Sequence, residues 1–245
     1  MQLQLMTWPE VEAYLAERRD ILIPIGSTEQ HGPSGLIGTD ALTAEAIAIR
    51  TGAKVGAIVA PCLSIGMAHH HLGFAGTLTL RPTTLVAVVG DVVASLVRHG
   101  FDRILFVNGH GGNIATVNAA IQQIYADASL AGTPGPVRVG LVSWWDGPRV
   151  KALCRELYGA ADGSHATASE ISVTWALHPD RAQEGRVLDP PVAPSNGPWA
   201  DALDYRRRHP DGRIGSDPSL SRIAHGERLM QAAVEDMAEI HARRI

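Results

Sequence analysis

Apolar and polar residues are arranged in two kinds of segment along the chain. Short runs of consecutive apolar residues are typical of strands buried on both faces, whereas apolar residues at every third or fourth position are typical of helices that bury one face. The predicted strands are 21–25, 55–60, 103–107 and 137–142, and the predicted helices are about 7–19, 39–50, 83–99, 113–131 and 222–243. This alternation predicts an α/β fold, a three-layer α/β/α sandwich around a mostly parallel sheet.

Local signals support these boundaries. A capping-box pattern starts the first helix, and Gly52, Gly100 and Gly132 follow the ends of three later ones. The segment 189–221 differs, because it is rich in Pro, Gly and polar residues and lacks periodicity. Since only one predicted helix follows it, we interpret it as an irregular excursion within a single domain of residues 1–245.

Composition narrows the class of protein. The 245 residues are 45% hydrophobic and 19% charged with a formal net charge of −4, which fits a globular domain with a sizeable core. The basic run 206–208 has no basic face around it, so we expect a solvated or subunit-contact loop and no nucleic-acid partner. Cys62 and Cys154 are too few for a disulfide framework. With no signal segment and no long apolar run, we expect a cytoplasmic protein that binds no membrane.

Side chains that bind metals follow two of the predicted strands. Glu29 and His31 lie in a loop directly after the first strand, where positions i and i+2 of an extended segment project to the same side. Asp40 lies near the start of the next helix, and His110 lies between glycines directly after the third strand. Because sites in such sheets collect at the carboxyl ends of strands, we expect these four side chains to converge.

A later patch adds two more candidates. His165 and Glu170 lie five residues apart at the start of a helical pattern. Glu, His and Asp ligands without cysteine suit Zn²⁺ or Mn²⁺, and a carboxylate that bridges two ions indicates a binuclear site with metals about 3.5–4 Å apart. We expect Asp40 to be that bridge.

Each candidate also has a plainer interpretation. Glu29 and His31 could be loop residues that hydrogen-bond the backbone. His110 could mark an anion-binding turn at a helix amino terminus. His165 could cap a helix or pack in the core.

Two further groups bear on the pocket. Residues 69–71 are three consecutive histidines, and three such side chains cannot all face one ion in a regular strand. One or two of them, with His70 as the candidate, are expected to line the pocket. Trp144 and Trp145, just beyond the strand 137–142, are either core or pocket wall, and the position at the end of a strand favours the wall.

Four motifs, in order, resemble those of the creatininase family of metal-dependent amidohydrolases. Residues 26–40 match its G-S-x-E-Q-H-G-P type loop, 76–81 match G-T-x-x-L-R, 108–113 match N-G-H-G-G-N, and 165–170 match H-A-x-x-x-E. The resemblance covers roughly residues 8–180, and it is specific because the motifs agree in kind, order and spacing.

The resemblance implies a creatininase-like fold and two divalent metal ions, Zn and/or Mn. It places Glu29 and His110 on one ion and His31 on the other. Creatininase itself has a ligating glutamate at the position of Gly112, so Glu170 is the expected replacement. The implied ligand set is Glu29, His31, Asp40, His110 and Glu170.

The resemblance further implies hydrolysis of a non-peptide or cyclic C–N amide bond in a small-molecule substrate by metal-activated hydroxide. His165 matches the family's catalytic histidine and is expected to pass a proton to the leaving nitrogen. Two aromatic residues of creatininase are absent, because Gly111 and Ala161 take their places, so creatinine is a doubtful substrate. The expected substrate-binding residues are Gly111, Trp144, Asp162 and His70.

Several alternatives stay open. The family includes peptidases of redox-cofactor maturation and hydrolases that open keto-inositol rings, and a metal-dependent lyase is a related possibility. A non-catalytic module that binds a nucleotide or anion at its Gly-rich turn is the alternative of another class. Family members commonly form hexamers, so we expect a homo-oligomer, with the segment 189–221 and its Trp199 and Tyr205 as contact surface.

Overall fold

The fold is built on a parallel sheet of four strands in a computed structural model that describes residues 1–132 and 137–244. The strand order is β2-β1-β3-β4, and Ile21 of β1 pairs with Ile104 of β3, which pairs with Val139 of β4. The two central strands, β1 and β3, therefore end side by side. The strands are β1 (Asp20–Ile25), β2 (Ile58–Val59), β3 (Arg103–Asn108) and β4 (Arg138–Ser143).

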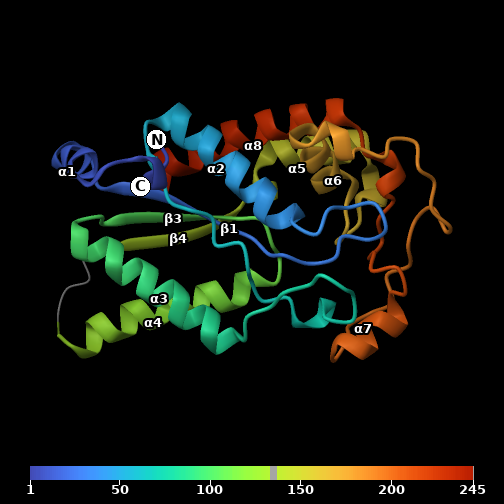
Figure 1. Cartoon of the computed structure of the whole chain (residues 1–245), viewed down its shortest axis with the longest axis horizontal. Coiled ribbons are helices and arrows are strands. Elements are labelled where there is room, and N and C mark those ends of the chain that lie inside the picture. Colours follow the sequence, from blue (N-terminus) through green and yellow to red (C-terminus); the bar gives the residue numbers. More distant parts are fainter. Residues whose placement is uncertain (133–136, 245) are drawn as a thin grey trace.

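Helices cover both faces of this sheet, as the sequence pattern predicts (Figure 1). In β1, Ile21 and Ile23 pack into the core beneath α3 and α4, whereas Leu22 packs into the core beneath α2 and α8. Because neighbouring side chains point to opposite faces, a strand covered on both must be apolar throughout. The helices are α1 (Trp8–Glu17), α2 (Thr39–Val55), α3 (Pro82–His99), α4 (Asn113–Leu130), α5 (Pro148–Leu157), α6 (Ala168–Leu177), α7 (Ala202–Arg208) and α8 (Ile223–Arg244).

Some predicted boundaries are wrong. Helix α2 does not end at Gly52 but continues to Val55 and ends at Gly56, whose φ of 71° favours glycine. The predicted strand 55–60 shrinks to the two residues of β2, and Val55 and Gly56 form the end and the cap of the helix instead. Helices α5 and α7 were not predicted. Helix α7 lies within the supposedly irregular segment, and the basic run is its exposed last turn instead of a loop.

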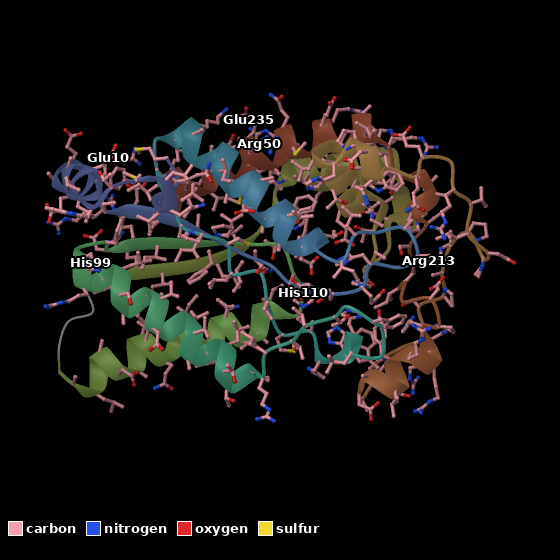
Figure 2. The ribbon with its side chains drawn as sticks, viewed as in Figure 1. Glu10, Arg50, His99, His110, Arg213 and Glu235 are labelled. Carbon is pink, nitrogen blue, oxygen red and sulfur yellow. The ribbon has the colours of Figure 1, made fainter. Side chains whose placement is uncertain are left out.

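The segment 189–221 contains a buried arginine, Arg213, which lies at the opposite end of the molecule from Glu10 and His99 (Figure 2). The Arg213 guanidinium donates to the carbonyl oxygens of Pro191 (2.6 Å) and Pro190 (2.8 Å) and forms an ion pair with Asp211. Tyr205 of α7 is fully buried against His71, with ring centroids 4.7 Å apart. The segment therefore packs beside the histidine triplet.

Within residues 1–132 and 137–244, no helix combines the length and apolar character needed to cross a lipid bilayer.

Candidate metal centre

The loops after β1 and β3 meet because small residues allow close approach. A side chain at Gly109 would overlap the backbone of Asp40, so the glycine lets the loop after β3 contact the first turn of α2. Asn108 holds this loop in shape, because its side chain donates to the His110 carbonyl (2.7 Å) and accepts from the His110 amide (3.1 Å). Asn113 donates to the carbonyl of Gly26 (2.9 Å), which ties the two loops together. The asparagines of the N-G-H-G-G-N motif thus shape the site, a role that the motif alone does not reveal.

The Asp40 carboxylate lies between two imidazoles. Its Oδ1 is 2.9 Å from Nε2 of His31, and its Oδ2 is 2.9 Å from Nδ1 of His110. Glu29 Oε2 lies 3.2 Å from Nε2 of His110, and Glu170 Oε2 lies 3.8 Å from Nε2 of His31. The five side chains predicted as ligands therefore come together. Two sets of three side chains each place their ligand atoms within 4.8 Å of one another, as a metal site requires. One set is Glu29, Asp40 and His110, the other is His31, Asp40 and Glu170, and Asp40 belongs to both.

The donor set fits metal ions. Among the described residues, none satisfies Glu29 Oε1, His31 Nε2 or Asp40 Oδ2 with a well-aligned hydrogen bond, although all three atoms are buried. Each of these atoms lies close to an imidazole or carboxylate neighbour but in poor alignment for a hydrogen bond, an arrangement that suits binding of a cation between them. Carboxylate and imidazole donors without thiolate suit Zn²⁺ and Mn²⁺. Geometry and chemistry agree with a two-ion centre around Asp40.

The electrostatics of the cluster favour positive charge. Burial opposes the charged form of both imidazoles, but nearby carboxylates outweigh it, chiefly Asp40 for His31 and Glu29 for His110. They raise the pKa of His31 to about 10 and the pKa of His110 to about 9. Protons held there occupy the place that cations would take, since ligand imidazoles must be neutral to bind a metal.

Glu170 has one oxygen free for a metal. Its Oε1 accepts a hydrogen bond from the amide of Thr167 (2.6 Å), and Thr167 caps the amide of Glu170 in return, forming a capping box at the start of α6. Its Oε2 faces His31. Burial raises the pKa of Glu170 to about 7, which an adjacent cation would reverse. A side chain at Gly112 would overlap His110 Nε2 and the Met67 carbonyl, so that position cannot supply a ligand here.

The orientation of His165 follows from the hydrogen bonds of Gln30. The Gln30 Oε1 accepts from the amide of Gly32 (2.8 Å), so its NH₂ group faces the Gly212 carbonyl (3.0 Å), His71 Nδ1 (2.9 Å) and His165 Nε2 (2.9 Å). The two protons of this NH₂ group go to the Gly212 carbonyl and to His71 Nδ1. His165 Nε2 needs neither of them, because it can itself donate to the Gln30 backbone carbonyl, 2.9 Å away.

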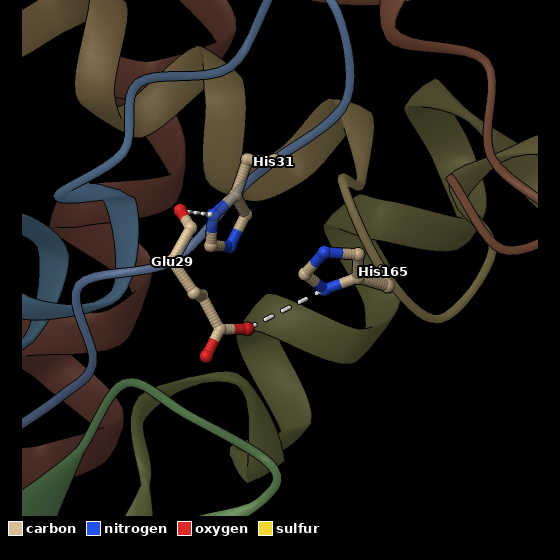
Figure 3. Close-up of side chains that lie close together, drawn as sticks. All are labelled: Glu29, His31 and His165. Carbon is tan, nitrogen blue, oxygen red and sulfur yellow. Dashed lines mark hydrogen bonds and ion pairs between the residues drawn. The ribbon is translucent and has the colours of Figure 1, made fainter. Parts of the chain in front are cut away.

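His165 therefore carries its proton on Nε2 and presents the lone pair of Nδ1 to Glu29 Oε1, 3.9 Å away (Figure 3). Burial and the neighbouring imidazoles of His71 and His31 hold the pKa of His165 well below its usual range. The ring is therefore neutral, and its Nδ1 carries no proton and can accept one. A neutral imidazole can also bind a metal ion, and His165 forms with Glu29 and His31 a third group of side chains that could hold one.

Of the three consecutive histidines, His71 lies against a predicted metal ligand. His71, not His70, faces the centre, with Nε2 3.1 Å from Glu29 Oε1 and its ring 4.3 Å from that of His165. His70 packs between α7 and the centre, with ring centroids 5.4 Å from Trp199 and 5.6 Å from Tyr205, and it does not line the cavity. The triplet forms a 3₁₀ turn, in which the three side chains fan out. A strand assumption could not reveal this.

A cavity of about 560 Å³ opens beside the centre. Asp40, His110, His165 and Glu170 line it, and so do three of the predicted substrate-binding residues, Gly111, Trp144 and Asp162. Trp144 proves to be both core and wall, since it is 1% exposed. Asp162 accepts hydrogen bonds from the Ser169 amide (2.9 Å) and hydroxyl (3.0 Å), while burial raises the pKa of its carboxyl group.

Fold and site together define an α/β metallohydrolase with an active-site cavity at the carboxyl edge of its sheet. The sequence model of creatininase, described as creatinine amidohydrolase, matches residues 4–241. The chain belongs to the creatininase family of amidohydrolases. It is 30% identical to creatinine amidohydrolase of Pseudomonas putida over 96% of this chain and 93% of that protein, and 30% identical to the mycofactocin precursor peptide peptidase of Mycobacterium ulcerans over 97% and 86%.

Solved structures agree. A manganese form of creatininase superposes with a TM-score of 0.86 at 28% identity, covering 98% of this chain and 96% of that one. A mutant creatininase of Zn-Zn type superposes with a TM-score of 0.85 at 28% identity over the same fractions. The fold predicted from sequence is confirmed, and the metals found in these relatives are those that the donor set of this chain suits.

Proposed function

We propose that this amidohydrolase cleaves a non-peptide or cyclic C–N amide bond of a small molecule at a centre of two divalent ions, Zn and/or Mn. The observation that carries the proposal is the Asp40 carboxylate, whose two oxygens each lie 2.9 Å from a different imidazole. A carboxylate so placed can serve two ions at once. The residues that would hold the ions are Glu29, His31, Asp40, His110 and Glu170.

The residues of the chain divide the chemical work. Two divalent ions, when bound, supply a Lewis acid for a carbonyl oxygen and lower the pKa of water. Ser27 donates to Glu29 Oε2 (2.6 Å) and holds that carboxylate in place. His165, whose Nδ1 carries no proton, accepts a proton from the attacking water and passes it to the leaving nitrogen. The chain has no need of a side-chain nucleophile.

Creatinine is not the substrate that we propose. Gly111, which lines the cavity, and Ala161 stand where creatininase carries two aromatic residues. A flat cyclic amide is held best between aromatic faces.

Assembly and location complete the proposal. We propose a homo-oligomer, with a hexamer as the first expectation, and residence in the cytoplasm. Exposed apolar side chains on the segment 189–221, among them Val192 and Leu203, support a contact surface there. Tyr205 does not, because it is buried within the chain. Cys62 and Cys154 are unpaired, which suits a reducing compartment. A light-scattering mass near that of one 26.1 kDa chain would contradict the oligomer.

Metal analysis of the purified protein tests the core of the proposal. We expect about two equivalents of Zn or Mn per chain after metal-supplemented growth. Hydrolysis of a panel of amides, lactams and short peptides, abolished by chelation and restored by metal, then identifies the substrate. A protein that holds no metal after supplementation would overturn the proposal and favour a non-catalytic module.

A further inference from the structure

Helix α5 brings two cationic side chains to the active-site cavity. Lys151 and Arg155 both line it, together with Trp144 and Trp145 from the turn after β4. The metal ligands Asp40, His110 and Glu170 line the same cavity. A molecule bound at the metals thus shares its cavity with two positive charges that the proposed chemistry does not use.

Arg155 stands out because its charge is unpaired. Arg149, on the same helix, binds Asp236 at 2.8 Å and also Glu239, and Lys151 binds Asp146 at 3.2 Å. In contrast, no described residue forms an ion pair or a hydrogen bond with the Arg155 guanidinium. A carboxylate that shares the cavity, Asp162, is bonded to Ser169 instead.

A second donor in the cavity wall is also unused. Trp144 is buried, and among the described residues none accepts a hydrogen bond from its indole Nε1. An indole nitrogen is a donor only, and a buried donor without an acceptor is costly. Among the described residues, the wall of the cavity therefore combines one buried indole N–H that lacks an acceptor with one solvent-exposed guanidinium that lacks a carboxylate partner.

We infer that Arg155 and Trp144 form a subsite for a carboxylate group of the substrate. A planar guanidinium binds a carboxylate through two parallel hydrogen bonds, and the indole N–H can donate to the same group or to an adjacent carbonyl. Resting on the proposed function, this inference names the substrate class: an amide that also carries a carboxylate, with the scissile bond at the metals and the anion at Arg155. Neutral amides of the same shape bind more weakly.

A plainer role for Arg155 is to stabilise α5, since it lies in the last turn, where a cation interacts favourably with the helix dipole. That role changes the melting temperature and leaves ligand affinity unchanged. The carboxylate subsite changes ligand affinity. The two roles are therefore separable in one variant.

The test uses straight-chain dicarboxylates from malonate to adipate as probes of the metal-loaded protein, with the monocarboxylate of equal carbon number as the matched partner of each. Calorimetric titration gives both dissociation constants. We expect one chain length at which the dicarboxylate binds about tenfold more tightly than its partner, since a charge-assisted pair is added. Arg155→Ala should reduce that preference to less than about twofold, and Arg155→Lys should retain part of it.

Arg50→Ala is the matched control, because Arg50 is an exposed arginine on α2 outside the cavity (Figure 2). It should leave the preference unchanged. Absence of any dicarboxylate preference in the unaltered protein, or an unchanged preference in Arg155→Ala, would overturn the subsite. Metal content is measured on each sample. Failure to hold metal would overturn the proposed function, whereas two bound ions without a preference that depends on Arg155 would overturn the subsite alone.

Discussion

Buried carboxylates lie near both ends of strand β1, and they differ in how many of their oxygens have hydrogen-bond partners. At the start of the strand, Asp20 is 1% exposed, and both of its carboxylate oxygens have partners. Its Oδ1 accepts hydrogen bonds from Arg18 (2.9 Å) and Tyr14 (3.0 Å). Its Oδ2 accepts one from Arg18 (2.7 Å) and lies 2.9 Å from Nε2 of His241 in α8. Just beyond the other end of the strand, Glu29 and Asp40 are equally buried, yet each has an oxygen without an aligned partner.

The difference separates a structural charge from a functional one. A buried charge with all its partners joins elements, and Asp20 joins the first strand to the last helix. A buried charge with unused lone pairs costs stability in the free protein, and a ligand restores it. Substitutions at the start of β1 should therefore lower the free energy of unfolding, whereas substitutions at the other end should lower metal content and activity.

The largest effect is expected for Asp40→Ala. Because this carboxylate lies between His31 and His110, its loss should remove both metals and with them all measurable hydrolysis. Metal content by mass spectrometry checks this, with Asp91→Ala, an exposed residue of α3, as the control. Full metal content in Asp40→Ala would show that Asp40 is not the bridge.

His165→Ala should lower kcat by about 10²–10⁴ and leave both metals bound, because the proton carrier is lost and the ligands are kept. The loss should shrink for anilides, whose leaving groups are more acidic than those of alkylamides. Steady-state kinetics with both substrate types checks this. An equal loss for the two would make His165 a positioning residue, and loss of a metal would make it a ligand.

The end of β1 that holds the site was easier to predict than the rest of the cavity. Glu29, His31, Asp40 and His110 follow regular strands or open a regular helix, so the direction of the chain brings them to one edge of the sheet. Helices α3 and α4, with their long amphipathic patterns, were likewise predictable.

The residues that sequence did not reveal depend on irregular backbone or distant contacts. His71 faces Glu29 because of a 3₁₀ turn, and Gln30 orients His165 across 135 positions of sequence. The pairing of Asp20 with His241 joins opposite ends of the chain. Periodicity describes neighbours along one element, so it cannot report such contacts.

Asp20→Asn tests the structural end. It should lower the free energy of unfolding by about 2–3 kcal/mol, because it leaves Arg18 and His241 without their charged hydrogen-bond acceptor. Metal content should not change, since the ligands lie at the other end of the strand. Urea unfolding monitored by circular dichroism measures the free energy of unfolding, and mass spectrometry measures the metal content. Loss of metal without loss of stability would contradict the comparison.

Glu170→Gln should weaken the affinity for one of the two ions by more than about tenfold, because a neutral amide is a poorer ligand than a carboxylate. Glutamine keeps an acceptor for the capping box with Thr167, so the helix should stay intact. Competition with a metallochromic chelator measures the affinity, and Glu170→Ala shows the added cost of losing the cap. Unchanged affinity with lost activity would make Glu170 an acid–base group.

The smallest effect concerns pH at the structural end. Burial alone would raise the pKa of Asp20, but hydrogen bonds from His241, Arg18 and Tyr14 outweigh it and hold that pKa below its usual range. A carboxyl group whose pKa is lowered in the folded state contributes stability that is fully present above the unfolded-state pKa, about 3.9, and is lost as the pH falls towards the folded value. The difference in unfolding free energy between the unaltered protein and Asp20→Asn should therefore shrink by about 1 kcal/mol between pH 5 and pH 3. Metal release at low pH affects both proteins alike and cancels in that difference. A gap that stayed constant over this range would show that Asp20 titrates equally in the folded and unfolded chain.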